Sequence, residues 1–77
     1  MRIKLLFFGQ VRDITGSSET ELAGITTISD LKKYLFNKFP PLKDSKFLIS
    51  VNRKIVNDNS TLNNGDEVAI LPPFAGG

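Results

Sequence analysis

The residues with the clearest chemical potential are the last six, Pro72 to Gly77, which read PPFAGG. Prolines cannot donate strand hydrogen bonds and hold the backbone extended, so we expect the folded body to end at Leu71. The closing glycines, Gly76 and Gly77, let the backbone enter a space where any Cβ would clash. The segment therefore predicts a narrow tail that places the carboxylate of Gly77 in a site on another protein. An inert, flexible chain end is the alternative.

The rest of the chain offers little catalytic equipment. Its 77 residues include no cysteine and no histidine. This excludes a disulfide, a cysteine nucleophile and a Ser-His-Asp triad within the chain, and it argues against zinc and other transition-metal sites. We expect one small domain with a thin core, no bound cofactor or metal, and no catalytic side chains of its own.

Charge is unevenly spread along the chain. Seven basic residues and one acid lie between Lys32 and Lys54. No nucleic-acid motif and no interleaved stacking aromatics accompany them, so a solvated helix face explains them better than a nucleic-acid site. No apolar run approaches the roughly 20 residues of a membrane span, and the N-terminus lacks a signal-peptide pattern. We expect a cytoplasmic protein without nucleic-acid or membrane partners.

Hydrophobic periodicity predicts a strand over residues 2–8, with Ile3, Leu5 and Phe7 on one face. Gly9 should break that strand, and Gly16 should cap the short helical turn that follows it. The other expected elements are the helical turn over 11–14, an edge strand over 17–22, a connector over 42–46, strands over 47–51, 54–56 and 67–71, and a loop over 57–62. Tight turns are expected at Asn52-Arg53 and at Asn64-Gly65.

One amphipathic helix is expected over residues 27–39. Ile28, Leu31, Leu35 and Phe39 form a single apolar stripe. Thr27 and Asp30 supply a capping pattern at its start, and Pro40-Pro41 ends it. The fold class is therefore α+β, a mixed sheet with one main helix across one face. The first and last strands are the most apolar, so they should be central, adjacent and parallel.

This arrangement divides the chain into a body, residues 1–71, and an extended tail, residues 72–77. It also predicts an uncovered face of the sheet. If Ile3, Leu5, Phe7, Val68 and Ile70 lie under the helix, the opposite face carries the apolar residues Leu6, Phe8, Ala69 and Leu71, with Phe74 just beyond them. We interpret this cluster as a surface for a protein partner. Scattered surface hydrophobic residues, which are normal, are the alternative.

A carboxylate is a poor acyl donor because its oxygen is a bad leaving group, so it must first be activated, typically as a mixed anhydride with a nucleotide. The chain has no phosphate-binding glycine loop. The activating enzyme, which consumes the nucleotide, is therefore expected to be separate.

Three segments of the chain together carry a family resemblance: LFFGQVRD at residues 6–13 followed by Gly16, NGDEVA at 64–69, and PPFAGG at 72–77. In this order, and over nearly the whole chain, they resemble the small subunits of molybdopterin synthase. The resemblance implies a ubiquitin-like β-grasp fold. It also implies that a separate ATP-dependent enzyme adenylates Gly77, that sulfur replaces AMP to give a thiocarboxylate, and that this sulfur is donated to cyclic pyranopterin monophosphate.

The resemblance further implies the partners and the site. The partners are the large synthase subunit, in a heterotetramer, the adenylating enzyme and a sulfur donor. The chemical site is Gly77 with Gly76. The family's apolar partner surface maps onto Phe8 and Phe74. Together with the uncovered face of the sheet, this gives the residues that we expect to contact the large subunit: Leu6, Phe8, Ala69, Leu71, Phe74 and Ala75.

Three other classes of protein share parts of this pattern. A thiazole-synthesis sulfur carrier has the same fold and the Gly-Gly end, although it tends to be shorter and lacks the Phe-Phe and Pro-Pro pairing. A ubiquitin-like modifier would form isopeptide bonds with lysines. A plain β-grasp binding module would have an inert tail.

Overall fold

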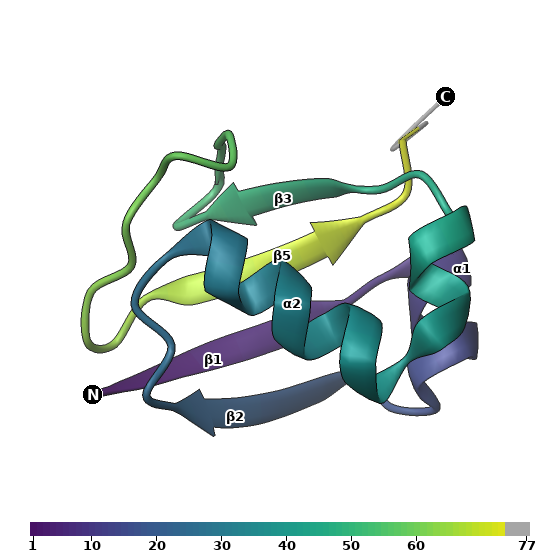
Figure 1. Cartoon of the computed structure of the whole chain (residues 1–77), viewed down its shortest axis with the longest axis horizontal. Coiled ribbons are helices and arrows are strands. Elements are labelled where there is room, and N and C mark those ends of the chain that lie inside the picture. Colours follow the sequence, from purple (N-terminus) through teal and green to yellow (C-terminus); the bar gives the residue numbers. More distant parts are fainter. Residues whose placement is uncertain (74–77) are drawn as a thin grey trace.

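The structure is a computed structural model, and it describes residues 1–73 of the chain (Figure 1). This part folds into one five-stranded sheet with two α-helices and a 3₁₀ helix. In chain order the elements are β1 (Arg2–Phe7), α1 (Gly9–Thr15), β2 (Glu19–Ala23), α2 (Ile28–Lys38), the 3₁₀ helix η1 (Pro40–Asp44), β3 (Leu48–Val51), β4 (Lys54–Ile55) and β5 (Glu67–Leu71).

The sheet has the strand order β2-β1-β5-β3-β4. β1 and β5 pair in parallel, with Leu5 opposite Val68 and Phe7 opposite Ile70, whereas the other pairs are antiparallel. The first and last strands are therefore central, adjacent and parallel, which confirms the prediction from their apolar character. Helix α2 crosses one face of this sheet (Figure 1), so the α+β class is confirmed as well.

Helix α2 forms for the local reasons visible in its sequence. Its N-cap, Thr27, accepts a hydrogen bond from the backbone N–H of Asp30 at 3.0 Å, and Asp30 lies where the positive end of the helix favours an acid. Ile28, Leu31 and Leu35 are fully buried. The helix ends before Pro40, because a residue that precedes proline avoids helical backbone angles; Phe39 has φ −128° and ψ 76°.

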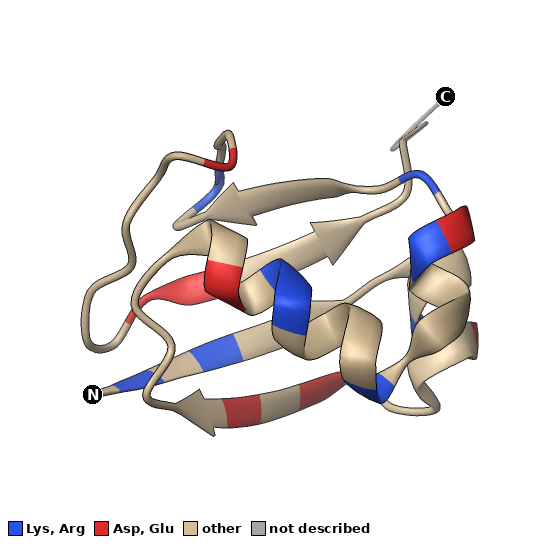
Figure 2. Ribbon diagram, viewed as in Figure 1, with Lys and Arg blue, Asp and Glu red and all other residues tan. Residues whose placement is uncertain are grey.

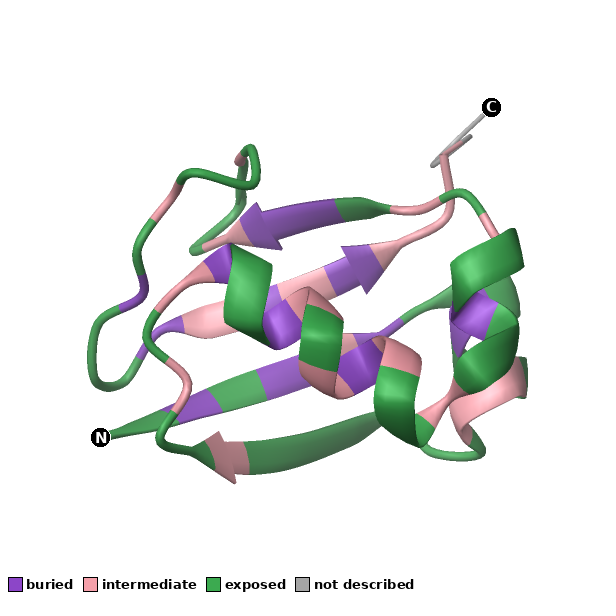
Figure 3. Cartoon of the chain, in the orientation of Figure 1, coloured by how far each residue is buried: buried purple, intermediate pink, exposed green. Residues whose placement is uncertain are grey.

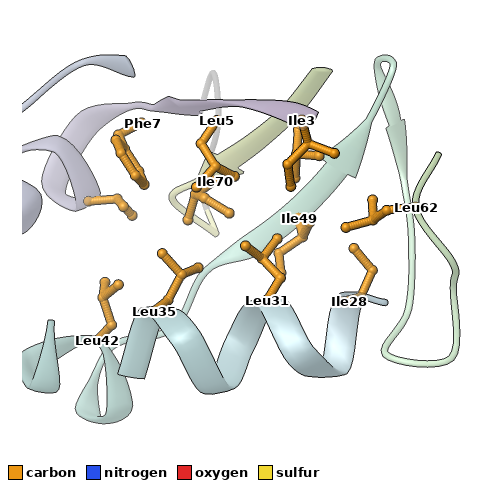
Figure 4. Packing of buried hydrophobic residues seen from close by; sticks show 12 residues of the cluster. Ile3, Leu5, Phe7, Ile28, Leu31, Leu35, Leu42, Ile49, Leu62 and Ile70 are labelled. Carbon is orange, nitrogen blue, oxygen red and sulfur yellow. The ribbon is translucent and has the colours of Figure 1, made fainter. Parts of the chain in front are cut away.

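The core lies between α2 and the sheet, as Figure 4 shows for the side chains that point from both sides into it. From the central strands, Ile3, Leu5 and Phe7 alternate with exposed or half-buried neighbours, and the burial pattern appears as bands along β1 in Figure 3. The ring of Phe7 meets that of Phe39 edge to face, with centroids 6.3 Å apart. Phe39 thus extends the stripe of α2, although it is only half-buried.

The segment after β1 differs from its prediction. The strand ends before Gly9, as expected, but we expected only one helical turn, over residues 11–14. Instead α1 begins at Gly9 itself and runs to Thr15. Gly9 has φ +56°, which glycine adopts at little steric cost. Gly16 caps the helix as expected, with φ +76° and its N–H donating to the carbonyl of Arg12 at 2.9 Å.

The expected connector over 42–46 was also wrong. Residues 40–44 form η1, which buries Leu42 completely. Its first residues are prolines, which the first turn of a helix tolerates because their missing N–H groups would have no helical partner. Leu62, expected in a loop, is only 4% exposed and belongs to the core too. Both are isolated leucines outside any repeating apolar pattern, so no periodicity marked them.

The strands match their expected positions to within two residues at each end, and both predicted turns are present. Asn52 and Arg53 have φ angles of 51° and 73°, as a two-residue hairpin loop with the strand twist requires. Gly65, with φ +85°, donates its N–H to the carbonyl of Arg2 at 2.8 Å. This bond ties the turn before β5 to the start of β1 and aligns the two central strands.

Leu35→Ala should lower the free energy of unfolding by about 2–5 kcal/mol, because it removes a fully buried side chain from the contact between α2 and the sheet. In a domain of this size, each kcal/mol lowers Tm by about 4–8 °C. Thermal and urea unfolding measure the change.

Leu48→Ala is the matched control, because it makes the same substitution at a side chain that is 39% exposed. Its cost should be about 1 kcal/mol or less. Equal losses for the two variants would show that Leu35 does not occupy the core.

Candidate functional site

The face of the sheet opposite α2 carries an apolar groove. Leu6 of β1 and Ala69 of β5 are register partners. Phe8 lies two residues after Leu6, and Leu71 lies two residues after Ala69. These four residues help to line a groove of about 400 Å³. Phe8 is 45% exposed, whereas the other three are half-buried. They share one face, as the alternation predicts, and their role in partner binding stays a prediction.

Ser50 of β3 and Ile55 of β4 also line this groove, and Leu48 of β3 lies on the same face of the sheet; the sequence analysis assigned none of the three to it. Ile55 of β4 lies opposite Ser50 of β3 and is 60% exposed. Ser50 in turn pairs with Ala69, and Leu48 pairs with Leu71 at the same end of the sheet. We name the combined surface the apolar patch; it comprises Leu6, Phe8, Leu48, Ser50, Ile55, Ala69 and Leu71.

The signal for these additional residues was present in the sequence. Leu48 and Ser50 alternate with Ile49 and Val51, as on a strand with two distinct faces. All four positions are compatible with burial, however, so alternation alone did not show which pair faces α2. The pairing of β3 with β5 decides it, because Ile49 lies opposite the buried Ile70.

The other end of the same face is charged. Arg2 and Lys4 of β1 lie across from the acids of β2, with Arg2 Nη1 3.2 Å from Glu21 Oε2 and Lys4 Nζ 3.3 Å from Glu19 Oε2. Figure 2 shows the basic bands of β1 beside the acidic bands of β2. These side chains are more than half exposed, so the pairs add little stability. They confine the apolar patch to the half of the face near the carboxyl ends of β1 and β5.

The chain leaves β5 at that same end. Pro72 and Pro73 are half-buried and, with Gly9 and the segment 44–46, line a second hollow of about 520 Å³. β5 ends at Leu71, and the division into a body and a tail at that residue stays a prediction. The remaining predicted site residues, Phe74, Ala75, Gly76 and Gly77, lie outside the described residues, and their roles stay predictions.

Asp66 is the buried carboxylate of the described part, and it serves the fold. Its Oδ1 accepts from Asn52 Nδ2 at 3.0 Å, and its Oδ2 accepts from the backbone N–H of Asn63 at 2.8 Å. Asn52 Oδ1 also accepts from the N–H of Glu67 at 3.0 Å. The network joins two turns beside β5. Within residues 1–73, no group of three or more metal-ligating side chains gathers around it or elsewhere.

The basic residues between Lys32 and Lys54 do not form one surface. Lys32 lies on the α2 side, with Nζ 2.6 Å from Asp58 Oδ1 and 6.0 Å from the ring centroid of Phe47. Arg53 instead lines the groove on the opposite face. This separation agrees with the solvated-surface interpretation. Among residues 1–73, no helix has the length and apolar character that a membrane crossing requires.

Three comparisons with known proteins agree on the family of this chain. A family model described as the ThiS family matches residues 5–77. The molybdopterin synthase sulfur carrier subunit of Escherichia coli K12 is 39% identical over 80 residues, which cover 97% of this chain and 99% of that protein. A solved structure of a putative molybdopterin converting factor, subunit 1, from Pyrococcus furiosus has a TM-score of 0.83 and 25% identity, covering 95% of this chain and 98% of its own.

Two further structures bear on the alternatives. Small archaeal modifier protein 1 from Methanosarcina acetivorans has a TM-score of 0.78 and 27% identity, over 99% of this chain and 96% of its own. The other is a chain in the complex of subunits 1 and 2 of molybdopterin-converting factor from Helicobacter pylori 26695. It aligns with the whole of this protein over its own full length, with a TM-score of 0.75 and 22% identity. At that identity the likeness shows the fold alone. The expected ubiquitin-like β-grasp fold is thereby confirmed.

Proposed function

The chain belongs to the ThiS family and, by its curated relatives, to the sulfur carrier subunits of molybdopterin synthase, and on that premise we propose that it carries sulfur on the C-terminal carboxyl group of Gly77. The observation that carries the proposal is the position of the apolar patch at the end of the sheet where the chain leaves β5. A partner that binds the patch would receive the tail on the same side.

The proposed chemistry uses no side chain of this protein. In a separate enzyme, an oxygen of the Gly77 carboxylate attacks the α-phosphorus of ATP, pyrophosphate leaves, and an acyl adenylate forms. Sulfur at the oxidation level of hydrosulfide then attacks the acyl carbon, the bond to AMP breaks, and AMP leaves a thiocarboxylate behind. The absence of cysteine from the sequence fits this scheme, because no thiol of the carrier competes as sulfur acceptor. ATP-dependent activation also supports a cytoplasmic location as part of the proposal.

Delivery requires the large synthase subunit as partner. We expect that subunit to cover the apolar patch, with Phe8 as an aromatic anchor. The tail would then enter the active site of the large subunit, where its sulfur is used to build the dithiolene of molybdopterin from cyclic pyranopterin monophosphate. Gly76 and Gly77 suit such a passage because they carry no Cβ.

A protein modifier is the second candidate, and the likeness to small archaeal modifier protein 1 supports it. Both functions begin with the same acyl adenylate. They differ in the final acceptor of the activated acyl group, which is sulfur for a carrier and a lysine amine for a modifier. Intact mass spectrometry of the chain from cells separates them: a carrier shows one oxygen replaced by sulfur, whereas a modifier shows lysine-linked conjugates.

Deletion of Gly77 should abolish sulfur transfer, because the carboxylate of Gly76 would stop about 3.5 Å short of the reacting position. Folding should be unaffected, since the core residues lie between Ile3 and Ile70. Single-turnover sulfur transfer and thermal unfolding measure the two effects.

Binding of the truncated chain to the large subunit is the control for this deletion. The truncated chain should still bind that subunit through the apolar patch with a Kd close to that of the full chain. Sulfur transfer at the normal rate by the truncated chain would contradict the carrier mechanism.

Phe8→Asp should weaken binding of the large subunit by at least about 30-fold, as expected when an aromatic anchor is lost. The fold should tolerate it. Phe8 is the N-cap of α1, with extended backbone angles and no side-chain cap, and aspartate is a preferred residue at that position. Isothermal titration calorimetry and thermal unfolding provide the two measurements.

Asn37→Asp is the matched control, because it adds the same charge to an exposed position on α2, on the other side of the sheet. Its Kd should stay within about twofold of the unmodified chain. If both variants bind equally well, the apolar patch is not the docking surface.

A further inference from the structure

Gly9 and Pro72 meet where the chain leaves the sheet. A Cβ built on Gly9 would lie 3.0 Å from Cγ of Pro72, 3.6 Å from its Cδ and 3.7 Å from its Cβ. The proline ring therefore packs against the bare α-carbon of Gly9. Among residues 1–73, three other glycines have positive φ angles, and a Cβ on any of them meets nothing within 4 Å: Gly16, Gly24 and Gly65. Position 9 is the one of these four where both a close contact and the backbone angle favour glycine.

The contact follows from the parallel pairing of the central strands. Phe7 pairs with Ile70, and the N–H of Phe8 donates to the carbonyl of Ile70 at 3.2 Å. The pairing thus continues one residue beyond β1. The residues that follow the two strands include Gly9 and Pro72. The sheet brings these two residues together although they lie at opposite ends of the sequence.

Pro72 also restricts the backbone at this point. Its ring holds φ near −65° and biases Leu71 toward extended backbone angles. A rigid residue that rests against a fixed helix start leaves the chain little freedom of direction at that point. Gly9 supplies the fixed start, because it opens α1, whose Val11 is buried in the core.

We propose that the Gly9–Pro72 contact sets the direction in which the C-terminal tail leaves the body, which makes Gly9 a positioning residue for sulfur transfer. This inference rests on the proposed carrier function. The five residues after Pro72 reach at most about 17 Å, so a rotation of about 10° at Pro72 would move the far end by about 3 Å. A misplacement of about 1 Å can slow an enzymatic step about 100-fold.

A double-mutant cycle tests the contact, with Gly9→Ala, Pro72→Ala and the double variant in the full chain. Gly16→Ala is the matched control. It places the same methyl group at a positive φ angle at the other end of α1, where no neighbour lies within 4 Å. For each variant, single-turnover sulfur transfer to the large subunit gives the rate, and calorimetry gives the Kd of that subunit.

Gly9→Ala should lower the transfer rate at least about tenfold while Kd stays within about twofold, because the apolar patch is untouched. Gly16→Ala should change neither quantity by more than about twofold. The Pro72→Ala variant lacks the proline ring. Adding Gly9→Ala to that variant should therefore lower the transfer rate by no more than Gly16→Ala lowers it in the unmodified chain. An equal loss from Gly9→Ala in both backgrounds, or losses from Gly9→Ala and Gly16→Ala that match, would overturn the inference.

Pro72→Ala keeps the test decisive if Gly9→Ala does not fold, because Pro72 follows the last strand. By itself it should slow transfer several-fold at unchanged Kd, and an unchanged rate would overturn the inference. In the unmodified chain, a nuclear Overhauser effect between the α-protons of Gly9 and the γ-protons of Pro72 should report the contact directly, and its absence would also overturn it.

The outcomes separate this inference from the function on which it rests. An unmodified chain that never acquires sulfur overturns the carrier function, and with it the transfer role of Gly9. An unmodified chain that transfers sulfur normally, but shows no coupling between Gly9 and Pro72, overturns only the positioning role.

Discussion

The parallel pairing of β1 with β5 is the constraint on which the rest of the structure depends. Parallel neighbours cannot be joined by a tight turn, so the chain needs a long crossover, and α2 lies within it. The same pairing brings the carboxyl ends of the first and last strands to one edge of the sheet. Phe8 and Gly9 therefore lie beside Leu71 and Pro72. The point where the tail begins is built from both ends of the sequence.

A chain of 77 residues can cover only one face of such a sheet, because so short a domain buries a limited share of its surface. Helix α2 covers the face that holds the core. The opposite face is divided into two halves. Ion pairs between β1 and β2 occupy one half and keep the edge strand polar, which discourages pairing with other chains. The apolar patch occupies the other half, next to the tail, where a carrier needs its partner.

Local sequence signals were reliable where one short segment determines its own structure. The 3–4–4 spacing of the α2 stripe, the Thr27 cap and Pro40 defined that helix closely. Gly16 and Asn64-Gly65 marked their turns for the same reason, since positive φ angles demand particular residues. Leu42 and Leu62 were missed because burial of a lone leucine depends on neighbours from distant segments. The start of α1 at Gly9 was missed because glycine more often interrupts a helix than opens one.

By itself, the sequence determined the type of most elements, the apolar character of both faces of the central strands, and the chemistry available to the chain, because composition and periodicity are properties of the residues alone. It also indicated the family through three short motifs. Only the tertiary structure decided that β3 and β4 extend the apolar patch with Leu48 and Ile55. Only the tertiary structure showed that the ring of Pro72 packs against Gly9. Both depend on which strands pair and in which register, and that choice is made by the whole core, since a shift of one residue would exchange every buried side chain for an exposed one.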